Sequence, residues 1–136
     1  MNPQNRHDLI NTLLKFLPEI STPLVNLVTY LNSAIEKDEA RNEVTISNIF
    51  NELEQLVATL TQLFEYDRGN TLQTGLEIEE NTLYKDFIRN LTQGLKIMLV
   101  WMKDEDEPEE KLKESVDMLF TAAQQILELV NLITKD

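Results

Sequence analysis

Apolar residues recur along this chain at steps of three and four residues, and no stretch shows the strict alternation of a β-strand. The clearest series holds a seven-residue pattern over nearly three repeats: Ile46, Ile49, Phe50, Leu53, Leu56, Val57, Leu60, Leu63 and Phe64. Such a repeat places a stripe on one side of a helix and favours packing against helices that run alongside it. The sequence therefore predicts an all-α fold, a four- to five-helix antiparallel bundle.

Helical spacing occurs in five segments, at residues 5–17, about 22–40, 45–66, 82–103 and 107–135. Pro18 disfavours the α conformation at Leu17, and Ser21-Thr22-Pro23 has the form of a helix start, with a hydroxyl cap before a proline. Residues 5–40 are therefore predicted either as a short helix followed by a longer one or as one kinked helix. Thr45 or Ser47 is expected to cap the third segment.

The size and composition of the chain fit one folded domain over residues 1–136. Its hydrophobic fraction of 42% is too high for intrinsic disorder, and 136 residues are enough to bury a core without disulfides. The longest uninterrupted apolar run is Ile97 to Met102, far short of the roughly 20 residues that span a bilayer. The N-terminal residues lack the pattern of a secretory signal. We expect a cytoplasmic protein.

The residues that usually carry chemistry are scarce. The chain has no cysteine, three glycines and one histidine, His7, which lies in a terminal segment. A carboxylate metal site in a helix bundle uses Glu-x-x-His, which does not occur here. Gly94 follows no predicted strand, so it indicates a close helix crossing and not a phosphate-binding loop. We expect no enzymatic activity, no cofactor and no metal.

Negative charge dominates the chain, with 24 Asp and Glu against 12 Lys and Arg and a net charge of −12. Direct binding to nucleic acid is not expected, because it depends on clustered cations. Two acidic stretches stand out: Glu36, Asp38, Glu39 and Glu43, and Asp104, Glu105, Asp106 and Glu107. They are interpreted either as solvated surface or as the face of an acidic inhibitor or immunity-type protein. Such a protein would mask a basic surface of a toxin, nuclease or other nucleic-acid-binding protein.

Two predicted helices carry more apolar residues than one buried stripe needs. Ile97 to Met102 covers every direction of a helix for more than one turn, whereas a core-facing stripe is roughly 100° wide. Either this helix is enclosed on both sides, or it exposes an apolar surface that binds a second copy or another protein. The predicted interface consists of Ile97, Leu99, Val100, Trp101, Met118, Leu129 and Leu132. The expected function is protein binding, as a homodimer, an adaptor or a regulatory subunit.

One local likeness points the same way. Residues 19–24, Glu-Ile-Ser-Thr-Pro-Leu, are followed about thirty residues later by residues 53–57 and then 63–69. This arrangement resembles the dimerising helical hairpin of sensor histidine kinases, in which a histidine before the glutamate accepts phosphate. Pro18 occupies the histidine position here, and no glycine-rich ATP-binding boxes accompany the hairpin. The resemblance implies dimerisation without phosphotransfer.

Overall fold

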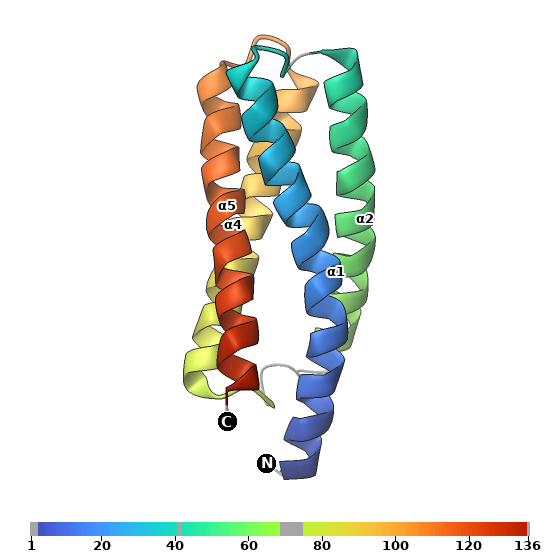
Figure 1. Ribbon diagram of the computed structural model, residues 1–136, viewed down its shortest axis with the longest axis vertical. Helices are drawn as coiled ribbons and strands as arrows, with labels where there is room; N and C mark the ends of the chain where they lie inside the picture. The colour runs from blue at the N-terminus through green and yellow to red at the C-terminus, as the bar shows by residue number, and fades with distance from the viewer. Residues whose placement is uncertain (1–2, 41, 69–74, 136) are drawn as a thin grey trace.

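Four long helices lie side by side along the longest axis of the protein in its computed structural model (Figure 1). The structure describes residues 3–40, 42–68 and 75–135, with no strand among them. The helices are α1 (Pro3–Glu36), α2 (Glu43–Asp67), α4 (Ile78–Lys103) and α5 (Glu109–Thr134). The predicted all-α fold is confirmed. The described residues form four helices, so the upper limit of five was wrong.

Helix α1 is continuous over 34 residues and contains both Pro18 and Pro23. The predicted alternative of a break near Leu17 is therefore wrong. An interior proline costs a helix about 3 kcal/mol through its missing N–H and its ring. Leu17, Ile20 and Leu24 are nevertheless at most 1% exposed, in phase with the stripe on either side. Burying each such side chain stabilises by about 1.5–3 kcal/mol, which offsets the local cost.

Helix α2 starts two residues earlier than predicted, because its cap lies before the hydroxyl residues. The Asn42 side chain accepts a hydrogen bond of 2.8 Å from the backbone N–H of Val44. Asparagine is among the preferred capping residues. Thr45 and Ser47, the predicted caps, instead lie inside the first turns of the helix.

An ion pair joins the starts of α1 and α4, although its two residues are 74 positions apart. Nη2 of Arg6 donates to both carboxylate oxygens of Glu80, at 2.8 and 2.6 Å, and Nη1 donates to the carbonyl of Gly75 at 2.6 Å. Glu80 is only 4% exposed, and its carboxylate also accepts from the N–H of Glu77 at 2.9 Å. Since Glu80 caps this end, α4 begins at Ile78, four residues before the predicted start.

Helices α4 and α5 approach each other closely where they cross at Gly94. A Cβ atom added at Gly94 would lie 3.0 Å from both Cγ and Cδ2 of Leu119, and 3.3 Å from Cβ of Met118. The hydroxyl of Ser115, on the same stretch of α5, donates to the Gly94 carbonyl at 2.7 Å. Glycine is needed here for close approach, which confirms the predicted helix crossing.

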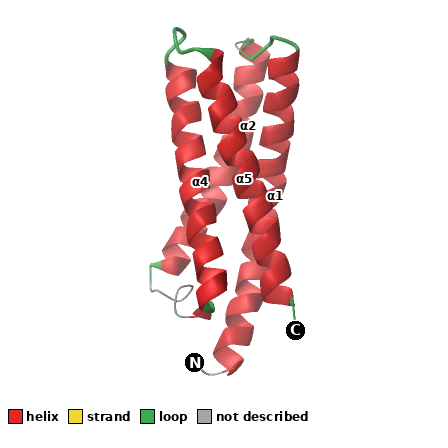
Figure 2. Cartoon of the chain, turned by 90° about the vertical axis from the view of Figure 1, so that its left-hand side faces the viewer, coloured by secondary structure: helices red, strands yellow, loops and turns green. Residues whose placement is uncertain are grey.

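The helices are not packed equally tightly around the molecule. Helix α4 lies close to α5, and α1 lies close to both α2 and α5, but α2 and α4 are not among the closely packed pairs. The α1–α2 and α4–α5 connections lie at one end of the molecule, and both termini lie at the other (Figures 1 and 2). The side between α2 and α4 is therefore the open side of the fold.

Helix α5 is, among the described residues, the one helix long and apolar enough to cross a membrane by length and composition. A single match of this kind is weak evidence, because core helices of soluble proteins also have it. Leu112, Leu119 and Ile126 of α5 are fully buried within the fold. Their burial accounts for part of the apolar composition of α5, whereas Phe120 and Leu127 are 50% and 51% exposed.

Candidate interaction surfaces

Two of the seven predicted interface residues lie in the core, which corrects the prediction. Trp101 is 1% exposed and Leu129 is 0% exposed. Each follows a fully buried residue, Met98 or Ile126, by three positions and so shares its core-facing side of the helix. The sequence shows that α4 and α5 carry more apolar residues than the core needs. It does not show which of these residues face the neighbouring helices and which face solvent.

The other five predicted residues remain accessible to different degrees. Leu99 and Val100 are 41% and 48% exposed, whereas Ile97, Met118 and Leu132 are half-buried. Leu132 lies apart from the rest, in a shallow pocket that it shares with Ile78 at the start of α4. The remaining four lie around the α4 surface, in two neighbouring hollows.

The larger of these hollows is an apolar groove of about 550 Å³ between α2 and α4. We call it the α2–α4 groove, and it is lined by Val57, Leu60, Thr61, Phe64, Thr92, Leu95, Lys96, Leu99, Val100 and Lys103. Leu60 is buried and Leu95 is half-buried, whereas Val57, Phe64, Leu99 and Val100 are exposed. The groove coincides with the side on which the helices are not closely packed.

An apolar ridge on α2 borders this groove and was missed from the sequence. Phe50, Val57 and Phe64 recur every seven residues and are 50%, 51% and 45% exposed. Their seven-residue spacing predicts that they belong to the core stripe, but the residues that point inward are the preceding ones in each repeat, such as Ile49 and Leu56. Paired apolar positions in each repeat make the stripe wider than one buried face requires. As on α4, a stripe of this width indicates that some of its apolar residues lie outside the core.

The two sides of the α2–α4 groove differ in charge. Lys96 and Lys103 of α4 are its only charged lining residues, and both are exposed with no ion pair to any described residue. On α2, the exposed Glu54 and Glu65 lie seven residues before and four residues after Thr61, on the same side of the helix. The outer edge of the groove is thus basic along α4 and acidic along α2.

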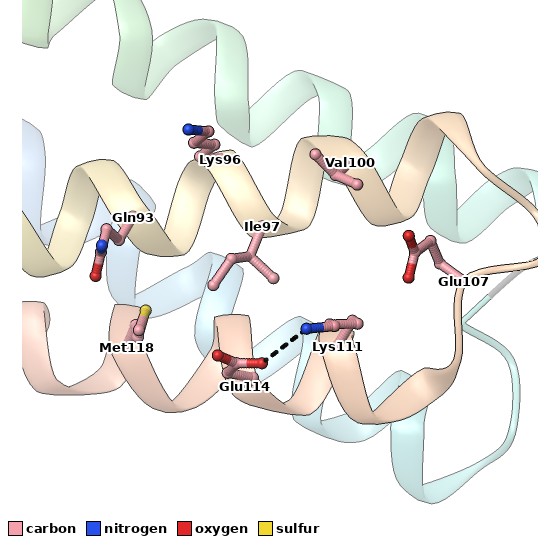
Figure 3. A pocket seen from close by; sticks show the side chains of 8 residues that line it. All are labelled: Gln93, Lys96, Ile97, Val100, Glu107, Lys111, Glu114 and Met118. Carbon is pink, nitrogen blue, oxygen red and sulfur yellow. Dashed lines mark ion pairs between the residues drawn. The ribbon is translucent and has the colours of Figure 1, made fainter.

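The second hollow lies between α4 and α5 and is shown in Figure 3. It has a volume of about 420 Å³ and is lined by Gln93, Lys96, Ile97, Val100, Glu107, Lys111, Glu114 and Met118. Ile97 points from α4 toward α5, and an ion pair of 3.7 Å between Lys111 and Glu114 lies opposite on α5 (Figure 3). This hollow brings the predicted residues Ile97, Val100 and Met118 together. Its mixed lining makes it less apolar than the α2–α4 groove.

The structure also brings the two acidic stretches of the sequence to one end of the molecule (Figure 1). Asp38 from the α1–α2 connection and Glu107 from the α4–α5 connection line the same small pocket, of about 190 Å³. All eight predicted residues of the acidic face are exposed except Glu107, which is half-buried. Within the described residues, no group of three His, Cys, Asp or Glu side chains is arranged to hold a metal ion. The geometry is that of an acidic surface.

One buried polar pair lies away from these surfaces. Burial raises the pKa of the Tyr84 hydroxyl, and the nearby negative charge of Asp67 raises it further. Burial likewise raises the pKa of the Asp67 carboxyl, an effect that interaction with Tyr84 partly opposes. Oη of Tyr84 and Oδ1 of Asp67 are both enclosed without a well-formed hydrogen bond. The Tyr84 hydroxyl would be protonated at neutral pH even at its ordinary pKa, and the raised pKa extends that protonation to more alkaline pH.

The chain matches no protein-family model, no curated protein and no solved structure. The resemblance to the hairpin of sensor histidine kinases therefore gains no support from these comparisons. Its Ser21-Thr22-Pro23 segment lies in the interior of α1 and does not begin a helix. Inference about function rests on the surfaces of the protein itself.

Proposed function

We propose that this protein is a non-enzymatic helical bundle that acts through protein contacts, with the α2–α4 groove as its main binding surface. It would serve as a homodimer, an adaptor or a regulatory subunit, and we place it in the cytoplasm as a single domain of four antiparallel helices. The observation that carries the proposal is the row of exposed apolar side chains on both sides of the groove. They are Val57 and Phe64 on α2 and Leu99 and Val100 on α4, and Phe50 continues the α2 row beyond the residues that line the groove.

The distribution of exposed apolar residues supports this choice. Single exposed apolar side chains are ordinary on soluble proteins, but a contiguous patch beside a hollow is typical of an interaction site. Phe50 and Phe64 add large aromatic surfaces, which are enriched at protein interfaces. Because α2 and α4 are not closely packed, the groove has room for the side chains of a partner.

Paired substitutions of equal chemistry test the proposal. Val100→Asp introduces a charge at the edge of the groove, and Val25→Asp introduces the same charge on α1, where Val25 is 42% exposed and lines neither hollow. Both variants are expected to keep the helical circular dichroism and cooperative melting of the wild type. Val100→Asp is expected to lose self-association or co-purifying partners, whereas Val25→Asp retains them.

Two results would contradict the proposal. If Val100→Asp melts far below Val25→Asp, the Val100 side chain belongs to the core of the monomer. If both variants fold and associate as the wild type does, the α2–α4 groove is not a binding surface.

A second function, that of an acidic inhibitor, is supported by the meeting of two distant acidic stretches at one end of the fold. The candidate face contains Glu36, Asp38, Glu39, Glu43, Asp104, Glu105, Asp106 and Glu107. A complex of this kind depends on charge, so its affinity should fall steeply as salt rises, whereas an apolar contact changes little. Binding to a basic protein that survives Asp38→Asn together with Glu105→Gln and Asp106→Asn would exclude this role.

A further inference from the structure

We infer that the α2–α4 groove is also a site for a small molecule, a single-chain carboxylate with an apolar tail, that is, a free fatty acid. The tail lies between α2 and α4, and the carboxylate faces the lysines on the α4 edge. The inference goes beyond the protein contacts proposed above, because it requires no second protein and names a ligand by its chemistry. It is drawn from the size, the lining, the shape and the charge of the groove.

The groove has the size and lining of a site for an apolar tail. Its volume of about 550 Å³ lies within the roughly 300–1,000 Å³ of pockets that hold small molecules. Leu60 and Leu95 are its least exposed lining residues, and exposed apolar side chains of α2 and α4 stand on either side of them. The uncharged polar residues among the lining are Thr61 and Thr92. An alkyl chain in the groove would therefore contact mainly apolar atoms.

The groove also has a direction along the helices. At one end α2 and α4 are linked, because Asp67 interacts with Tyr84 one turn beyond Phe64 and two turns before Thr92. Away from this link the groove follows α4 from Thr92 to Lys103, about 16 Å at 1.5 Å per residue. A ligand laid along it can place its tail toward the Asp67–Tyr84 link and keep its head at the basic edge of α4.

The charge of the lining favours a head group with one negative charge. Lys96 and Lys103 are the charged lining residues, and neither forms an ion pair with any described residue. A lysine packs its methylenes along apolar surface and keeps its ammonium in water, where it can meet a carboxylate. The net charge of −12 and the exposed Glu54 and Glu65 of α2 repel a head group with several negative charges, such as a phosphate. A single carboxylate fits both conditions.

Calorimetric titration with dodecanoate, below the concentration at which it forms micelles, tests the inference. We expect saturable binding of one molecule per chain. A fully buried methylene strengthens binding about fourfold, so dodecanoate should bind at least about tenfold more tightly than octanoate even in an open groove. Dodecyl phosphate has the same tail and should bind about fivefold more weakly than dodecanoate. Dodecyl phosphate that binds as tightly as dodecanoate would overturn the assignment of the head group.

Matched lysine variants test where the carboxylate lies. Lys96→Gln with Lys103→Gln should weaken dodecanoate binding about fivefold, the upper range for an exposed ion pair. Lys15→Gln with Lys113→Gln changes net charge equally, at exposed positions on α1 and α5 that line neither hollow, and should bind as the wild type does. Equal affinity in the two double variants would contradict the inference.

Matched leucine variants test where the tail lies. Leu99→Glu places a charge in the groove and should weaken dodecanoate binding at least about tenfold. Leu127→Glu makes the same change at an exposed position of α5 outside both hollows and should leave binding unchanged. Circular dichroism checks that both variants keep the helical content of the wild type. Folded variants with equal affinity would show that the tail does not lie in the groove.

These results distinguish failure of this inference from failure of the proposed function. If dodecanoate does not bind, the fatty-acid site is wrong, and the protein contacts still stand when Val100→Asp loses partners that Val25→Asp keeps. If dodecanoate binds as expected and Val100→Asp loses no partner, the groove is a small-molecule site and the proposed protein contacts are wrong.

Discussion

Replacement of Gly94 by alanine tests whether the α4–α5 crossing is as tight as the structure indicates. Alanine in place of glycine in a helix interior normally stabilises by about 0.8–1 kcal/mol. Here the new Cβ would lie 3.0 Å from two atoms of Leu119, and Leu119 is fully buried, so its side chain would have to shift by a few tenths of an ångström within the core. Overpacking of a core by one methyl group costs about 1–3 kcal/mol. The balance is a net loss of about 1 kcal/mol.

A double-mutant cycle isolates the contact from the helix propensity. Leu119→Ala removes the two atoms that the new Cβ would meet and costs about 2–5 kcal/mol by itself. In that background Gly94→Ala should stabilise by up to about 1 kcal/mol, because the propensity gain is then opposed only by the 3.3 Å contact with Cβ of Met118. The sign of the Gly94 substitution thus reverses, with a coupling energy of about 2 kcal/mol.

Urea denaturation of the four proteins, followed by circular dichroism, measures all the free energies of unfolding in this cycle. If Gly94→Ala stabilises the otherwise unchanged protein by the full gain of about 0.8–1 kcal/mol expected from helix propensity, the α4–α5 crossing is not tight. The same conclusion follows if the substitution has the same effect in both backgrounds, since the contact with Leu119 would then carry no energy.

Two further predictions concern the buried charges. Arg6→Met should lower the free energy of unfolding by about 2–3 kcal/mol, because it leaves the Glu80 carboxylate buried without its cation, and the loss should be smaller in a Glu80→Gln background. Asp67→Asn should raise the melting temperature at pH 7. Burial raises the folded-state pKa of Asp67 above its ordinary value of 3.8, so the folded protein favours the protonated carboxyl. The contribution of Asp67 to the free energy of unfolding is therefore highest below pH 3.8, and it is lost as pH rises through the folded-state pKa and the carboxyl becomes charged. The gain from Asp67→Asn should therefore shrink as pH falls toward 3, and a gain that grew on acidification would contradict it.

The sequence predicted the helices well because their apolar periods are long and uninterrupted. The sequence-based prediction was wrong where it relied on a single proline and the burial of the surrounding helix had the larger effect on stability. Pro18 disfavours helix at the residue before it, yet α1 continues because Leu17, Ile20 and Leu24 are all buried in one stripe. The rule for proline is local, and the energy that overrides it comes from neighbouring helices.

The candidate site was predicted only in part, for a related reason. The apolar surplus on α4 was found, and Leu99 and Val100 are indeed exposed, but Trp101 lies in the core. The width of an apolar stripe shows that some residues are surplus, whereas the placement of the other helices decides which ones. The Arg6–Glu80 ion pair could not be predicted from the sequence. Its two residues are 74 positions apart, and the sequence around each of them contains nothing that relates it to the other.

The attachment of α2 to one close neighbour has a mechanical consequence. Among the described helices α2 packs closely only against α1, whereas the α4–α5 pair is held by its tight crossing at Gly94. A rotation of α2 about its contact with α1 would widen or narrow the groove, within the limit set by the Asp67–Tyr84 interaction at the C-terminal end of α2. We expect the stiffness of the α1–α2 contact to decide which shapes the groove can take. If the groove binds a partner as proposed, we expect core side chains between α1 and α2, remote from that partner, to be positions at which its affinity is tuned.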